Sequence, residues 1–133
     1  MKRILLLFSL FISVEAFAPR TFALCIVRAE SVNMYDHLIQ AVVQVESHGD
    51  QWALNVKEQA TGAFQIRPCR VDHFNRLTGK HYTTADMFDY KKAREVFLCF
   101  AVWYGKDFET ISRNWNGAGK MTDDYWQRVK EKL

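Results

Sequence analysis

The chain has 133 residues, of which 49% are hydrophobic and 25% are charged, and its formal net charge at pH 7 is +3. These are ordinary globular proportions, which exclude a disordered chain, and the length suits one domain. The small excess of positive charge is dispersed along the sequence, so we expect no nucleic-acid partner.

The N-terminus has the pattern of a secretory signal peptide. Lys2 and Arg3 precede a nearly continuous apolar run over 4–14, and an A-x-A cleavage site follows at 16–18. The apolar run is too short to span a membrane comfortably. We therefore predict cleavage after residue 18, a periplasmic or secreted protein without stable membrane insertion, and an unpatterned lead-in over 19–32.

The remaining residues, 33–133, have the patterning of one mainly α domain. Apolar residues at helical spacing predict a first helix that begins near Asn33 or Asp36, either of which can cap it, and that stops before Gly49. Short polar and apolar stretches alternate over 50–66, which predicts a loop with a short hairpin.

Two helices are expected in the middle of the domain. A short one follows Pro68 and ends at Gly79. Asp89 is expected to cap a long helix, and Trp103 on that helix is expected in the core. The apolar stripe of this long helix is Ala93, Val96, Phe97, Phe100, Ala101 and Tyr104.

The C-terminal part of the domain combines helices with a glycine-rich turn. A short helix over 108–113 is expected to lead into the turn at 114–119. The last helix is expected to bury Tyr125 and Val129. The whole chain shows neither repeats nor a linker, which supports a single domain.

The three cysteines of an exported chain allow at most one internal disulfide. Cys69 and Cys99 both lie in the patterned domain, whereas Cys25 follows the signal peptide. We predict a Cys69–Cys99 disulfide, and two buried free thiols are the alternative. Leu24 stands where a lipoprotein has a small residue, so lipidation of Cys25 is not expected.

Glu46 is the most informative residue of the first predicted helix. It lies four residues after Val42 and seven after Ile39, which places its carboxyl group on the apolar stripe. Burial and the negative end of the helix dipole both disfavour the carboxylate, so both are expected to raise the pKa of Glu46 toward that of a general acid. The alternative is that Glu46 merely ends the stripe and points to water.

Three segments occur in an order that resembles the catalytic domain of lytic transglycosylases of the soluble-lytic-transglycosylase type, in the lysozyme-like superfamily. Members carry Glu-Ser at a helix end, Gly-Leu-Met-Gln-Ile-x-Pro, and an Ala-Tyr-Asn-Ala-Gly turn. The corresponding segments are Val45-Glu46-Ser47, Thr61-Gly62-Ala63-Phe64-Gln65-Ile66-Arg67-Pro68 and Asn114-Trp115-Asn116-Gly117-Ala118-Gly119, followed by Tyr125. Met87-Phe88-Asp89 also resembles the family's Leu-Phe-Asp segment. The resemblance covers 35–133.

The resemblance implies an α+β lysozyme-like fold, with the short irregular or hairpin segment beside an active-site cleft. It makes Glu46 the single acid/base in cleavage of peptidoglycan between N-acetylmuramic acid and N-acetylglucosamine. Glu46 would protonate the glycosidic oxygen and then take a proton from the C6 hydroxyl, which closes a 1,6-anhydro ring. The acetamido group of the substrate assists, so a second carboxylate is not required. Asp50 is therefore interpreted as a loop residue that caps a turn.

The resemblance also suggests supporting residues, each with a structural alternative. Ser47 would hydrogen-bond to Glu46 and orient it, and the alternative is a hydroxyl facing water. Tyr125 would support Glu46 or the acetamido group of the substrate, and the alternative is simple helix packing. Glycan contacts are expected from Gln65, Phe64, Trp115 and Asn116. For the two amides the alternative is closing the loop backbone, and for the aromatic rings it is filling the core.

No spacing of histidines and cysteines indicates a metal site, so neither a metal nor a cofactor is expected. We expect a monomer that acts on peptidoglycan glycan strands. Its small size suggests a wall-opening enzyme for a secretion or conjugation assembly. Two alternatives stay open, namely a muramidase in which water completes the reaction and a peptidoglycan-binding module without catalysis.

Overall fold

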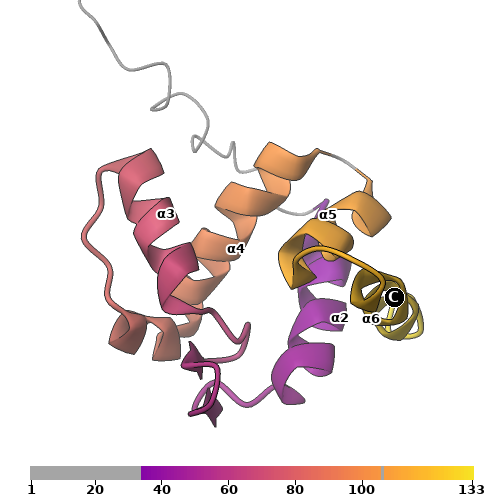
Figure 1. The fold of residues 1–133 in the computed structure, drawn as a ribbon, viewed down its shortest axis with the longest axis horizontal. Helices are drawn as coiled ribbons and strands as arrows, with labels where there is room; N and C mark the ends of the chain where they lie inside the picture. Colours follow the sequence, from indigo (N-terminus) through magenta and orange to yellow (C-terminus); the bar gives the residue numbers. More distant parts are fainter. Residues whose placement is uncertain (1–33, 106) are drawn as a thin grey trace, which may run out of the picture.

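The computed structural model describes residues 34–105 and 107–133. Within these ranges five α-helices, one 3₁₀ helix and a two-stranded antiparallel sheet surround a single hydrophobic core, which confirms the predicted mainly α fold (Figure 1). The predicted signal peptide, the lead-in over 19–32 and Cys25 lie outside the described residues. No helix in the described part is long and apolar enough to cross a membrane.

The first described helix, α2 (Asp36–Ser47), ends where the sequence predicts. His48 adopts a left-handed conformation with φ 55°, and its N–H closes the helix on the Gln44 carbonyl at 3.2 Å. The start differs from the prediction, because Tyr35 is the N-cap and makes no side-chain capping bond. Asp36 lies in the first turn, where a negative charge interacts favourably with the positive end of the helix dipole. Asn33 is outside the described residues.

The predicted hairpin is present and packs on a 3₁₀ helix. Strand β1 (Leu54–Asn55) pairs antiparallel with β2 (Ala60–Thr61). Gly62 directly after β2 has φ +78°, and a Cβ atom there would lie 1.9 Å from the Met87 carbonyl oxygen of η2 (Thr84–Phe88). Only glycine therefore allows this close approach between the hairpin and η2.

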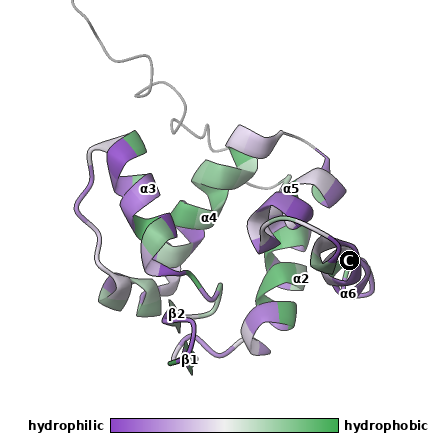
Figure 2. Ribbon diagram, in the orientation of Figure 1, coloured by the Kyte–Doolittle hydropathy of each residue, from purple (hydrophilic) through white to green (hydrophobic). Residues whose placement is uncertain are grey.

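The two middle helices agree with the sequence prediction. Helix α3 (Pro68–Thr78) begins with proline at its first position and is followed by Gly79 with φ 71°. Asp89 caps α4 (Tyr90–Tyr104), and its carboxylate accepts hydrogen bonds from the first-turn N–H groups of Lys91 and Lys92 at 2.8 and 3.2 Å. Hydrophobic residues dominate the middle of α4, which contacts α3, α5 and η2 (Figure 2).

The C-terminal helices pack against each other and close the domain around α2. Helix α5 (Phe108–Asn116) continues through residues predicted as a turn, and the turn begins at Gly117. Helix α6 (Met121–Lys130) buries Tyr125 and Val129 as predicted. Because α6 contacts both α5 and α2, residues near position 125 come close to the end of the first helix.

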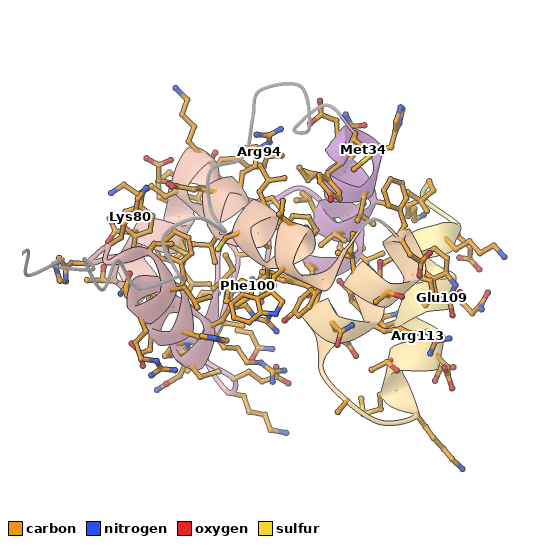
Figure 3. The ribbon with its side chains drawn as sticks, turned by 90° about the horizontal axis from the view of Figure 1, so that it is seen from above. Met34, Lys80, Arg94, Phe100, Glu109 and Arg113 are labelled. Carbon is orange, nitrogen blue, oxygen red and sulfur yellow. The ribbon has the colours of Figure 1, made fainter. Side chains whose placement is uncertain are left out.

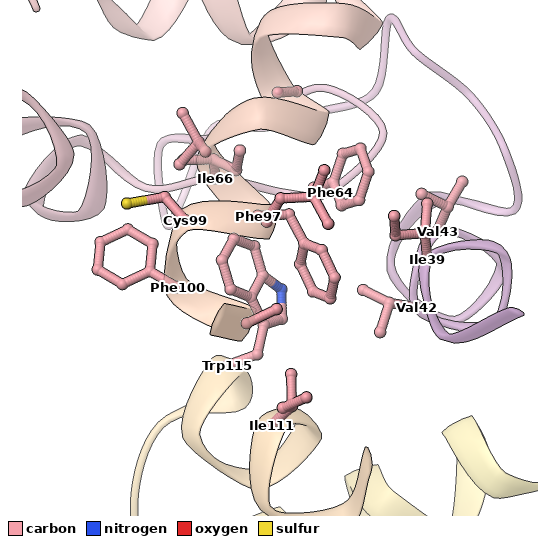
Figure 4. Close-up of a cluster of buried hydrophobic side chains, with 14 of the residues drawn as sticks. Ile39, Val42, Val43, Phe64, Ile66, Phe97, Cys99, Phe100, Ile111 and Trp115 are labelled. Atoms are coloured by element: carbon pink, nitrogen blue, oxygen red, sulfur yellow. The ribbon is translucent and has the colours of Figure 1, made fainter. Parts of the chain in front are cut away.

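Two aromatic residues expected to contact glycan belong to the core instead (Figure 4). Phe64 has no exposed surface and stacks on Phe97 with ring centroids 5.3 Å apart, so its prediction as a cleft residue is wrong. Trp115 is 6% exposed and packs edge-on against Phe97 at 4.9 Å. Trp103, expected in the core, is 46% exposed beside His73 on the outer face of α4.

The predicted Cys69–Cys99 disulfide is wrong. Cys69 is a free, exposed thiol in the first turn of α3. Cys99 is buried on α4 and is disulfide-bonded, but not to Cys69. The two cysteines belong to contacting helices but to different environments, since one helix start faces solvent whereas the middle of α4 faces the core.

Candidate active site

A cavity of about 330 Å³ opens beside the C-terminal end of α2. Its lining comes from α2, the hairpin, the start of α3, the end of α5, and α6. The lining residues are Val45, Glu46, Asn55, Glu58, Ala60, Gln65, Arg67, Cys69, Arg70, Trp115, Asn116, Gly117 and Arg128. Four of the predicted site residues thus meet in one place although they are up to 70 positions apart in the sequence: Glu46, Gln65, Trp115 and Asn116.

Glu46 and Tyr125 form a hydrogen-bonded pair at this cavity. The Tyr125 hydroxyl, on a residue that is 1% exposed, donates to Glu46 Oε1 at 2.7 Å. The predicted contact between the two side chains is therefore present. It joins the end of α2 to the first half of α6, and it fixes the direction of the carboxyl group.

Burial raises the pKa of Glu46 above that of an ordinary glutamic acid. The hydrogen bond from Tyr125 and the charges of Arg128 and Arg67 act in the opposite direction, while Glu58 adds to the rise. Burial also raises the pKa of Tyr125 far above the physiological range, so its hydroxyl keeps its proton. The pair therefore consists of a carboxyl group that holds its proton to higher pH and a neutral donor beside it.

The Ser47 hydroxyl contacts backbone carbonyl groups rather than the side chain of Glu46. Its hydroxyl lies 2.8 Å from the Ala63 carbonyl oxygen and 3.2 Å from that of Val43. Since the single hydroxyl hydrogen is directed to these carbonyls, the predicted direct hydrogen bond to Glu46 is wrong. Ser47 instead ties the end of α2 to the loop that follows β2.

Gln65 holds that loop in shape while it also lines the cavity. Its backbone adopts φ 48°, and its side-chain amide donates to the carbonyls of Gly62 and Ala53 at 2.9 and 3.3 Å. Thr61 and Ile66 exchange two backbone hydrogen bonds of 3.0 Å across the same loop. The structural alternative considered for Gln65, closing loop backbone, is thus what its amide nitrogen does.

The end of α5 forms another part of the lining. Asn116 is half-buried, and in the described part of the chain its side chain has no hydrogen-bond partner, which leaves it available to a ligand. Trp115 is mostly covered by core residues, so it forms part of the bottom of the cavity and does not present an exposed ring face on which a sugar could stack. Asp50, whose Oδ1 accepts from the Trp52 N–H at 2.8 Å, caps a turn as interpreted from the sequence.

Sequence reasoning missed three arginines of the lining. Arg67 forms an ion pair with Glu58 at the hairpin. Arg70 donates to the Tyr104 hydroxyl and to the backbone carbonyl of the residue at 115, both at 3.0 Å. The guanidinium carbon of Arg128 lies 5.5 Å from the centroid of the Tyr125 ring. The available signal was Arg67 and Arg70, three residues apart at a helix start next to the glutamine motif.

The chemistry available in this cavity is proton transfer by one carboxyl group. Glu58, the other carboxyl group of the lining, is exposed and paired with Arg67. The described residues contain no group of three or more histidine, cysteine, aspartate or glutamate side chains that could hold a metal ion. The arrangement thus offers one positioned acid/base, neutral hydrogen-bonding groups and several cations.

Comparison of the chain with models of known protein families, with curated proteins and with solved structures found no match. The family resemblance therefore depends on the motifs quoted above.

Proposed function

We propose that the protein is an exported peptidoglycan lytic transglycosylase with a lysozyme-like fold. It cleaves the β-1,4 bond between N-acetylmuramic acid and N-acetylglucosamine and leaves a 1,6-anhydro end. The observation that carries this proposal is the Glu46 carboxyl group, which lines a cavity, has a raised pKa and is held by Tyr125. A carboxyl group with these properties suits general acid catalysis near neutral pH.

In the proposed reaction Glu46 serves in both steps. Its proton passes to the glycosidic oxygen as the bond to the anomeric carbon breaks, and the acetamido group of the substrate stabilises that carbon. The resulting Glu46 carboxylate then takes the proton of the C6 hydroxyl, whose oxygen attacks the anomeric carbon and closes the anhydro ring. The enzyme returns to its protonated state without consuming water.

Tyr125 supports the charged half of this cycle. Its hydrogen bond at 2.7 Å favours the Glu46 carboxylate that exists between the two steps. Because the Tyr125 pKa is raised, the hydroxyl stays a donor throughout. Glu58 receives no catalytic role, since it is exposed and paired with Arg67, and the assisted mechanism needs only one protein carboxyl group.

The test is mass spectrometry of fragments released from purified peptidoglycan. Anhydro products, lighter by one water than hydrolytic products, are expected from the wild type. Reducing-end products would replace the proposal with a muramidase, in which water takes the place of the C6 hydroxyl. Binding to insoluble wall without release of fragments would indicate a peptidoglycan-binding module. The periplasmic or secreted location and a partner assembly for secretion or conjugation remain predictions.

A further inference from the structure

Arg70 is a cation that the described part of the protein holds in place without a carboxylate partner. It forms none of the ion pairs found there, and its two hydrogen bonds go to neutral acceptors, the Tyr104 hydroxyl and the Trp115 carbonyl. Its guanidinium carbon lies 4.4 Å from the centroid of the Trp115 ring and 4.9 Å from that of Phe100. The side chain is half-buried.

This geometry leaves Arg70 ready to bind an anion. A guanidinium group has five N–H donors, and the hydrogen bonds above use two of them. Stacking on two rings fixes the side chain, so little conformational entropy remains to be lost when a ligand binds. Arg70 lines the cavity that Glu46 also lines. Its charge acts on the hydroxyl of Tyr125, where it lowers the pKa against the effect of burial.

Two further arginines give the cavity an excess of positive charge. Arg67 and Arg128 line it together with Arg70, against the two carboxyl groups of Glu46 and Glu58. Arg67 is paired with Glu58, whereas Arg128 lies by the Tyr125 ring and forms no ion pair among the described residues. Arg67 and Arg128 are exposed, whereas Arg70 is half-buried and has no carboxylate partner among the described residues, which is costly unless a ligand anion compensates its charge. A guanidinium group matches a carboxylate through two parallel hydrogen bonds.

We infer that Arg70, with Arg128 and Arg67 beside it, forms a carboxylate-binding subsite that makes the protein select glycans carrying carboxylates over neutral β-1,4-linked N-acetylglucosamine chains. This inference depends on the proposed function, because it concerns the same cavity. In peptidoglycan the carboxylate has two sources, the lactyl group of N-acetylmuramic acid once its peptide is removed, and the stem peptide. Both present the same group to the arginines.

The test measures binding of three soluble ligands, with Glu46→Gln as the background so that none is cleaved. The ligands are chitobiose, the free-acid disaccharide of N-acetylglucosamine and N-acetylmuramic acid, and the same disaccharide with its stem peptide. The dissociation constant is expected to be about tenfold lower for at least one carboxylate ligand than for chitobiose, and Arg70→Gln should abolish this preference. The carboxylate ligand whose affinity falls more when Arg70→Gln is added identifies the source of the carboxylate.

Control variants separate charge from structure. Arg70→Lys keeps the charge and should restore part of the preference, and Arg76→Gln, an exposed change outside the cavity on the same helix, should leave it unchanged. If circular dichroism shows that Arg70→Gln does not fold, Arg128→Gln replaces it, since Arg128 is exposed. This variant should lose affinity for the carboxylate ligands selectively, but less than expected for Arg70→Gln. An equal loss for chitobiose and both acids in the folded variant would overturn the inference.

The two proposals fail in different ways. A wild type that solubilises wall, and whose Glu46→Gln variant binds chitobiose as tightly as both acids, contradicts the carboxylate subsite alone. A protein that prefers the acids and releases no fragments from wall contradicts the proposed reaction alone. In the second case the arginines would still define which glycan the cavity holds.

Discussion

Two glutamate–tyrosine pairs in this protein share the same hydrogen bond and differ in their surroundings. Tyr125 donates to Glu46 at 2.7 Å, and Tyr82 donates to Glu95 at the same distance. Glu46 is half-buried beside a cavity and forms no ion pair in the described part of the chain. Glu95 is exposed enough to meet solvent and is ion-paired with Lys80. Burial without a contacting cation, rather than the tyrosine, distinguishes a candidate acid.

The second pair has a structural explanation. Lys80 and Tyr82 both lie in the segment between α3 and η2, and Glu95 lies on α4, so the cluster connects that segment to α4. Figure 3 shows Lys80 at the end of the molecule away from α6. The cluster therefore supplies matched control substitutions that leave the cavity untouched.

The largest expected difference is in the rate of wall solubilisation by Glu46→Gln compared with Glu95→Gln. Glutamine keeps the size of Glu46 and can still accept the Tyr125 hydrogen bond, but it cannot transfer the proton. Wall solubilisation should fall about 10²- to 10⁴-fold, the usual contribution of general acid–base catalysis. Glu95→Gln should retain activity. The measurement is the rate of fragment release, with circular dichroism as the folding control. Comparable rates in the two folded variants would remove Glu46 from the mechanism.

Modification of Cys69 tests whether the cavity is where the substrate binds. Its thiol is free, exposed and part of the cavity lining. A bulky maleimide there should displace substrate and lower activity about 10²-fold, the effect expected of misplaced reacting groups. Cys69→Ser should be active and insensitive to the reagent. Full activity after labelling, with the adduct at Cys69 confirmed by peptide mapping, would move the substrate to another surface.

Tyr125→Phe against Tyr82→Phe tests the hydrogen bond itself. Removing the Tyr125 hydroxyl should lower kcat/KM about tenfold, comparable to a charge-assisted hydrogen bond of about 1.5 kcal/mol. It should also raise the pKa of Glu46 further, because that bond favours the carboxylate. Since the protonated acid is needed first, activity is lost as pH rises, and this limb should move to higher pH. A profile that shifts equally in Tyr82→Phe would contradict the pairing.

Most of the fold could be predicted because its helices carry strong periodic and capping signals. Asp89 and Pro68 mark helix starts, Gly79 and His48 follow helix ends, and Glu46 falls on a buried stripe that the 3.6-residue period reveals. These features are local in the sequence, so they can be read without knowing the tertiary packing.

The errors concern features that tertiary contacts decide. The glycines that follow Trp115 predict a turn there, yet α5 continues through Trp115, which packs on Phe97. Whether Phe64 faces the cleft or the core depends on a loop conformation that its motif does not encode. Spacing could not show whether Cys69 and Cys99 pair, because only the fold shows that the Cys69 thiol faces solvent whereas the disulfide-bonded Cys99 is buried on α4.

The smallest expected effect is on stability, where the two glutamates should differ in sign. Burial raises the pKa of folded Glu46, so the unfolded chain releases this proton first as pH rises, and the native state loses stability between the two pKa values. Glu46→Gln should therefore raise the melting temperature at pH 7, and this gain should vanish below about pH 4, where the unfolded glutamate is protonated as well.

At Glu95 the sign should be reversed. The hydrogen bond to Glu95 raises the pKa of Lys80, which stabilises the fold at all pH values below the unfolded pKa of lysine and is lost as pH rises through the folded value. Glu95→Gln should thus lower stability at pH 7 by no more than about 1 kcal/mol, as for other exposed pairs. Thermal unfolding of both variants at pH 4 and pH 7 measures the contrast. If Glu46→Gln is the less stable of the two at pH 7, the Glu46 carboxylate is well solvated in the native state, and burial does not set its proton affinity.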